Sequence, residues 1–235
     1  MRCVWEHNGD DTLLYAVDHI GAYTRGDSLE TALSKMNEEI RTYSLWNHQQ
    51  YEGISGVEII QEKCSDLRIA DADSDVLFDS EMAPLSSDEY ERLKTLVLKS
   101  ANDFYILYTS IENKHESCLP VRQTFYGNVP RTAHEMYEHT KNVNAYYFGE
   151  IGIDADNDGT ILECRQRGFS ALEKTADYLN NAVTEGSYGE LWSLRKLMRR
   201  FLWHDRIHAK AMYRMAMKTF GAFGVKNTYQ FREVL

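Results

Sequence analysis

Two histidines stand four residues apart in the segment LWHDRIHAKAM, residues 202–212. Residues at positions i and i+4 of an α-helix project from the same face, so a helix here would direct His204 and His208 to the same side. Two neutral imidazoles at this spacing can each donate a lone pair to one divalent metal ion. The spacing alone is a weak signal, because an ordinary histidine pair in a core or on a surface has it too.

A third histidine fits the same chemistry. The segment 132–149 predicts a helix, because it opens with the TxxE capping box of Thr132 and Glu135. His139 lies on the apolar stripe of this helix, and we expect it to face the same interior as His204 and His208. Three imidazoles form a site with at least one coordination position left for water or substrate. We assign none of the other histidines to the metal, namely His7, His19, His48, His115 and His134.

Long amphipathic helices must position these side chains. From Ser86 onward, apolar residues recur every three or four positions, which predicts helices over about 87–111, 132–149, 165–184 and 189–219. Four helices with short or moderate connections commonly pack as a bundle, and facing helices of a bundle commonly build metal sites. The sequence therefore predicts a four-helix bundle whose interior holds the histidines.

The first part of the chain has a different pattern. Residues 1–80 alternate strand-like runs with one helix, which we expect to begin at an Asp27 cap with Glu30 in the capping-box position. The turn sequence NGDD predicts a hairpin before this helix, and the run GVEII predicts a strand after it. We therefore predict the α+β fold class, with a small α+β module at 1–80, a helical domain at 85–222 and a C-terminal tail at 223–235.

The helical part resembles a known family. His139 followed by the sequence HDRIH at 204–208 is similar to the pattern of the DinB-like superfamily, with one histidine in the second helix and HxxxH in the fourth. That superfamily includes bacillithiol and mycothiol S-transferases and the mycothiol-dependent maleylpyruvate isomerase. The resemblance covers about residues 87–220. It implies an all-α DinB-like four-helix bundle in which His139, His204 and His208 are the metal ligands. It indicates the site more strongly than the reaction, since many members have no established activity.

A second resemblance concerns the segment GAYTRGDSLETAL. It is similar to the loop-to-helix signature of HicB-like domains, which is matched here by Gly21, Gly26, Asp27, Ser28, Glu30 and Ala32. The resemblance implies a non-catalytic N-terminal module that acts in binding or regulation. A Gly-Asp cap before any amphipathic helix has a similar sequence, so this alternative stays open.

The open coordination position suggests the reaction. A divalent ion lowers the pKa of a bound water or thiol, and so makes a nucleophile near neutral pH. With the resemblance, this implies a metal-dependent thiol S-transferase that joins a low-molecular-weight thiol to an electrophilic small-molecule substrate. A metal-dependent hydrolase and a non-enzymatic, metal-stabilised ligand-binding or regulatory protein are the alternatives. The sequence does not decide whether the chain is an enzyme. Imidazoles do not select the metal, since Zn, Ni, Fe and Cu all accept them, and Mn is a further candidate.

A rival metal site is suggested by the segment IGIDADNDGTILECRQR. Asp154, Asp156 and Asp158 occupy positions 1, 3 and 5 of a calcium-binding loop, and a glycine follows at position 6. Position 12 is Arg165, so the bidentate glutamate of such loops is missing. An acidic turn without a metal is the alternative interpretation.

Other polar residues near the predicted site have weaker assignments. Asp205 and Arg206 point roughly 100° and 200° away from His204 around a helix, so we expect them on the helix surface or behind the ligands rather than reacting. In the loop before the second helix, Arg122, Tyr126 and Asn128 could contact substrate, although surface-loop polarity explains them equally well.

Composition limits the partners and the compartment. The formal charge of −10, from 26 basic and 36 acidic residues, opposes a broad phosphate-binding surface, so we expect no nucleic acid as main partner. No run of 18 apolar residues and no signal-peptide core are present, so we expect a cytoplasmic protein that does not enter a membrane. The resemblance to DinB-like bundles also leads us to expect a homodimer.

The cysteines suggest no further site. No CxxC motif joins any of them, so they favour free thiols over a zinc ribbon or a disulfide framework. They are Cys3, Cys64, Cys118 and Cys164.

Overall fold

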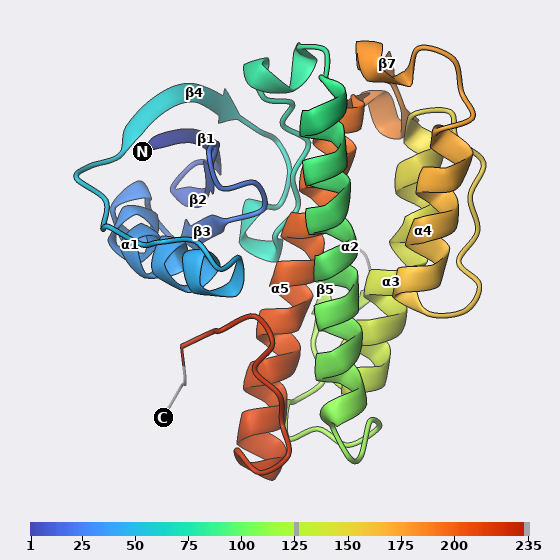
Figure 1. The fold of residues 1–235 in the computed structure, drawn as a ribbon. Coiled ribbons are helices and arrows are strands. Elements are labelled where there is room, and N and C mark those ends of the chain that lie inside the picture. The colour runs from blue at the N-terminus through green and yellow to red at the C-terminus, as the bar shows by residue number, and fades with distance from the viewer. Residues whose placement is uncertain (125–126, 233–235) are drawn as a thin grey trace. The chain divides into compact units, whose positions relative to one another are not determined.

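The computed structural model describes residues 1–124 and 127–232, and it confirms the α+β class (Figure 1). Its contacts divide the chain into two compact units. Unit 1 contains residues 1–84 and 181–203, and unit 2 contains 85–180 and the described residues from His204 on. We had expected 85–222 as one domain, whereas residues 181–203 group with the N-terminal part of the chain. Independent folding of the predicted domains stays a prediction.

Unit 1 contains a four-stranded sheet in the order β3-β2-β1-β4. Its elements are β1 (Arg2–Asn8), β2 (Asp11–Ala16), β3 (Tyr23–Gly26), α1 (Leu29–Trp46) and β4 (Glu58–Cys64). The hairpin at NGDD is confirmed, with Asn8 opposite Asp11, and the GVEII run forms part of β4, parallel to β1. The predicted order of strand, strand, helix and strand was wrong in one respect, because it left out β3.

The start of α1 explains that omission. The segment GAYTRGDSLETAL was interpreted as a loop leading to a helix, yet its residues 23–26 pair with β2 along the edge of the sheet. The helix cap is Ser28 rather than Asp27, because the Ser28 side chain accepts a hydrogen bond from the backbone N–H of Thr31. At Gly21 the backbone has a φ of +89°, and a Cβ there would lie 2.5 Å from the Cβ of Leu202, so glycine fits this close approach.

A buried carboxylate organises the segment that follows β4. Glu6 of β1 is fully buried, and its Oε1 accepts hydrogen bonds from the backbone N–H groups of Asp75 and Val76 at 3.0 and 3.2 Å. Its Oε2 accepts from the hydroxyl groups of Ser74 and Tyr15. Burial raises the pKa of Glu6, and these donors favour its ionised form.

Three cationic side chains hold the carbonyl groups of the same segment. Lys196, Arg199 and Arg200 lie within about one turn of α5 (Leu194–Phe220), and all three are buried. They donate to three successive carbonyl oxygens of residues 74–76, at 2.6 to 2.8 Å. Arg199 also pairs with the buried carboxylate of Glu81. The first part of α5 is therefore part of the interior of unit 1.

Four short strands and four 3-10 turns are the further elements of the described residues. They are the hairpins β5 (Gln123–Thr124) with β6 (Gly127–Asn128) and β7 (Thr184–Glu185) with β8 (Leu191–Trp192), and the 3-10 turns Ile69–Asp71, Asp79–Met82, Tyr178–Asn180 and Ser187–Gly189.

Unit 2 is helical, with α2 (Ser87–Ser110), α3 (Ala133–Glu150), α4 (Ile161–Leu172) and the second part of α5. The first two helices match the predicted spans within one residue. The prediction of 165–184 for the third was wrong, because Thr160 and Glu163 form a capping box that starts α4 earlier, and the helix ends at Leu172. The fourth helix begins at Leu194 rather than near residue 189.

Helices α3 and α4 run in the same direction. The backbone N–H of Ile161 at the start of α4 donates to the hydroxyl of Tyr137 near the start of α3, at 3.1 Å. Near the other ends, the rings of Phe148 and Phe169 pack edge to face, 5.4 Å apart. The connection between the two helices therefore returns along α3, where the side-chain amide of Asn144 donates to a backbone carbonyl of that connection.

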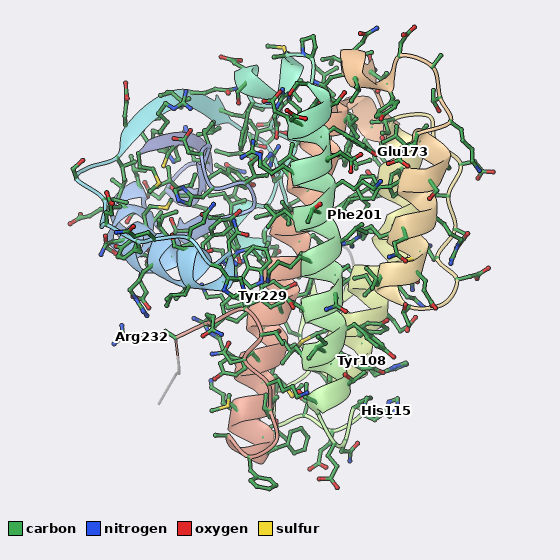
Figure 2. The ribbon with its side chains drawn as sticks, in the orientation of Figure 1. Tyr108, His115, Glu173, Phe201, Tyr229 and Arg232 are labelled. Atoms are coloured by element: carbon green, nitrogen blue, oxygen red, sulfur yellow. The ribbon has the colours of Figure 1, made fainter. Side chains whose placement is uncertain are left out.

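Helix α2 runs opposite to both. The ring of Tyr108 near its end stacks on Tyr137 near the start of α3, and Tyr90 near its start contacts Phe169 near the end of α4. Within the described part of the segment expected as a tail, the hydroxyl of Tyr229, which is labelled in Figure 2, donates to the carbonyl of Ser100 on α2 at 2.7 Å, so the chain returns to α2 there. No helix in the described ranges has the length and apolar composition needed to cross a membrane.

The paired charges inside unit 1 give a testable prediction. We expect Arg199→Met to lower the free energy of unfolding by about 3–5 kcal/mol, because it leaves the buried carboxylate of Glu81 without its partner. Arg214→Met on an exposed position of the same helix is the control, with an expected change within about 0.5 kcal/mol. Urea unfolding followed by circular dichroism measures both, and equal effects would contradict the role assigned to Arg199.

Candidate metal centre

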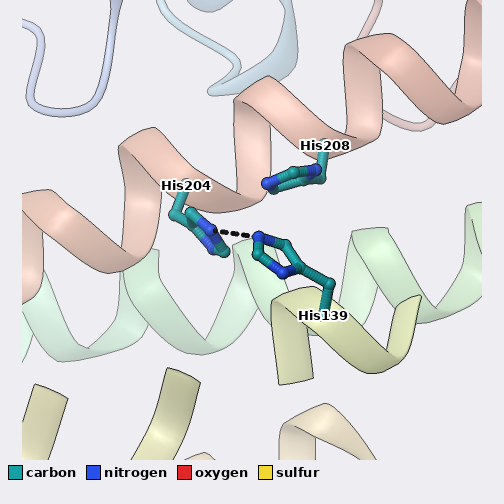
Figure 3. Close-up of side chains that lie close together, drawn as sticks. All are labelled: His139, His204 and His208. Carbon is teal, nitrogen blue, oxygen red and sulfur yellow. Dashed lines mark hydrogen bonds between the residues drawn. The ribbon is translucent and has the colours of Figure 1, made fainter. Parts of the chain in front are cut away.

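The structure brings together the three histidines selected from the sequence. His139 reaches from α3 toward His204 and His208, which project from successive turns of α5 (Figure 3). The Nε2 atoms of His139 and His204 are 3.3 Å apart, and the ring centroid of His208 lies 4.6 and 4.5 Å from those of His139 and His204. One nitrogen from each ring lies within 4.8 Å of the other two.

These distances fit a metal ion held by imidazole nitrogens. Two ligand nitrogens bound tetrahedrally at about 2.0–2.1 Å are separated by about 3.3–3.4 Å. The 3.3 Å between His139 and His204 matches that separation. A hydrogen bond between two neutral rings has a similar length, but it needs only two histidines. The nearby nitrogen of His208 supplies the third ligand that a metal site requires.

The three side chains differ in their exposure to solvent. His204 is buried and His208 is half-buried, whereas His139 is exposed. His139 therefore points toward His204 and His208 without being buried, because it lies at the edge of the buried stripe of α3. Neighbouring groups still exclude water from part of its ring, and this desolvation lowers the pKa of His139. The neutral imidazole that binds metals is thereby favoured, and the site is open on one side.

The residues that follow His204 are buried. Asp205 and Arg206 were expected on the helix surface or behind the ligands, and the surface interpretation was wrong. The carboxylate of Asp205 accepts two hydrogen bonds from Arg165 of α4, at 2.6 and 3.1 Å, and the guanidinium of Arg206 lies over the ring of Phe231. In the sequence, Arg165 was considered only as the residue that stands at position 12 of a calcium loop in place of glutamate. Its pairing with Asp205 was therefore not predicted.

The acidic connection between α3 and α4 has a structural explanation. The carboxylate of Asp156 pairs with Arg167, and Asn157 accepts a hydrogen bond from the backbone N–H of Ala145 in α3. These bonds favour the acidic turn over the calcium loop. Within residues 1–124 and 127–232, the three histidines form the one group of three or more histidine, cysteine or acidic side chains that could hold a metal ion.

The other candidate residues lie in separate surroundings. Arg122 and Asn128 are exposed, the latter in strand β6, and Tyr126 lies outside the described residues. Their role as substrate contacts stays a prediction. His134 contacts the hydroxyl of Tyr108 at 3.4 Å and the ring of His115, near the end of α2 and the start of α3.

Comparison of the chain with family models, curated proteins and solved structures finds no match. The resemblances to DinB-like and HicB-like proteins therefore remain expectations from motifs, and the candidate site depends on its geometry.

We predict that His139→Ala, His204→Ala and His208→Ala each lower bound metal well below one equivalent per chain, because each removes one ligand nitrogen. His134→Ala, on the same helix as His139, is the control and should keep the wild-type stoichiometry. Metal content after dialysis, measured by mass spectrometry on protein without a histidine tag, gives the result. Unchanged stoichiometry in any two of the three site variants would exclude this centre.

Proposed function

We propose that the chain binds one divalent transition metal ion through His139, His204 and His208. The observation that carries this proposal is the placement of one nitrogen from each ring within 4.8 Å of the others, on two helices of one unit. Zn, Ni, Fe, Cu and Mn are the candidate metals, because imidazole ligands alone do not distinguish them.

The residues present fit such an ion in number and kind. All three are imidazoles, which bind metal ions through a ring nitrogen, and three protein ligands leave a fourth position for another molecule, as in catalytic metal sites. A divalent ion in this position supplies Lewis acidity, which lowers the pKa of a thiol or water. The exposed side of the centre at His139 supports access for a small-molecule substrate.

We further propose that unit 2 is a DinB-like four-helix bundle with metal-dependent thiol S-transferase activity. The motif of His139 with HDRIH supports the family, and the opposed directions of α2 and the pair α3 and α4 are compatible with a bundle. In this proposal the histidines would hold the metal ion with its open position on the exposed side of the site. A low-molecular-weight thiol and an electrophile would bind on that side. The HicB-like module acts in binding or regulation and takes no part in the chemistry.

A turnover assay tests the reaction class. We predict that the metal-loaded protein accelerates the reaction of a low-molecular-weight thiol with an aromatic electrophile, and that chelation of the metal or His204→Ala abolishes the acceleration. Thiol consumption followed by absorbance measures it, with the His134→Ala variant as control. Metal-dependent ester hydrolysis without thiol consumption would replace the transferase by a hydrolase. A metal-loaded protein inactive in both assays would support a non-enzymatic binding protein.

The resemblance also leads us to propose a homodimer, since DinB-like bundles often pair through exposed helix faces. We predict a mass of twice the 27.3 kDa of one chain by light scattering. A mass of 27.3 kDa over a wide range of concentrations would contradict the dimer.

A further inference from the structure

A fully buried ion pair joins α4 and α5 in unit 2. The guanidinium of Arg165 donates from both terminal nitrogens to the two carboxylate oxygens of Asp205, at 2.6 and 3.1 Å. Both side chains have 0% exposure to solvent. The hydroxyl of Ser100 on α2 also bonds to Asp205, so three helices meet at this carboxylate.

Stability alone does not explain this pair. Removing two charges from water is costly, and buried ion pairs in other proteins can often be replaced by packed apolar residues with no loss of stability. What an ion pair adds is geometry, because a guanidinium fork and a carboxylate bond through two parallel hydrogen bonds in one orientation. Apolar contacts between two helices impose no such single orientation.

Burial alone does not specify the rotation of α5 within unit 2. Residues 201–206 are all buried, so no exposed face there identifies which side of the helix belongs against α4. The three cations of its first turns anchor α5 within unit 1, whereas Asp205 is bonded to α4 within unit 2. Successive residues of a helix are separated by about 100° around the axis. A rotation of this part of α5 by one residue would turn His204 away from His139 and would carry Asp205 away from Arg165.

We propose that Arg165 and Asp205 are positioning residues for the metal centre. Their ion pair fixes the rotation of the unit 2 part of α5 by directing Asp205 at α4, which places His204 and His208 on the side that faces His139. The inference rests on the proposed metal binding, and it assigns to Arg165 and Asp205 no contact with the metal.

The test separates positioning from stability by removing both charges together. The double variant R165M/D205L retains buried apolar volume and leaves neither charge without a partner. We expect it to fold with a cooperative thermal transition, to bind Zn²⁺ at least tenfold more weakly than the wild type, and to change the visible absorption spectrum of bound Co²⁺. The spectrum reports ligand geometry, which a change in stability alone would not alter.

A neighbouring ion pair provides the matched control. Arg167 and Asp156 also form a pair between α4 and the connection that precedes it, but their side chains are 46% and 47% exposed. The double variant R167M/D156L should keep the wild-type dissociation constant for Zn²⁺ and the wild-type Co²⁺ spectrum. An equal loss of affinity in this control would overturn the specific role of the buried pair.

Two further results would contradict the positioning role of Arg165 and Asp205. A folded R165M/D205L variant with the wild-type dissociation constant and Co²⁺ spectrum overturns it. If this variant does not fold, R165Q/D205N, which keeps polar side chains at both positions and removes the charges, is measured instead, with the same expectation and the same contradicting result. A wild-type protein that binds neither metal contradicts the proposed function and this inference together, whereas wild-type binding with unaffected variants contradicts the inference alone.

Discussion

The buried ion pair between Arg165 and Asp205 is the constraint on which the helical unit, unit 2, depends. Either charge without the other would destabilise the fold by about 3–5 kcal/mol, so α4 and α5 have to meet where both hydrogen bonds form. The histidines on α5 then have fixed directions, because they are part of the same rigid helix. A site of three ligands requires this accuracy, since small displacements of a ligand nitrogen weaken a metal bond.

Buried charged side chains also determine where the segment 74–76 packs in the interior of unit 1. Glu6 accepts hydrogen bonds from two backbone N–H groups of the segment 74–76, and three cations of α5 donate to its carbonyl oxygens. Every polar group in these bonds would be costly to bury alone. The segment is therefore held within unit 1, although it lies close to the predicted boundary at residue 80.

Local signals in the sequence predicted the parts of the fold that local interactions determine. The apolar spacing from Ser86 onward and the capping box at Thr132 gave α2 and α3 within one residue, and helix spacing placed His204 and His208 on one side of α5. The box at Thr160 offered the same signal and was missed. The pairing of Arg165 with Asp205 spans 40 residues and involves α4 and α5, so no local pattern reveals it. The solvent exposure of His139 also depends on packing between helices and could not be read from its apolar neighbours.

The central claim is that His139, His204 and His208 bind one metal ion. Anomalous diffraction from crystals grown with a slight excess of Zn²⁺ tests it most directly, because the signal at the absorption edge locates the ion. The account predicts one dominant peak within about 2.0–2.1 Å of a nitrogen of each of the three histidines. Crystals that show Zn²⁺ bound elsewhere, with no peak among these three side chains, would contradict the account.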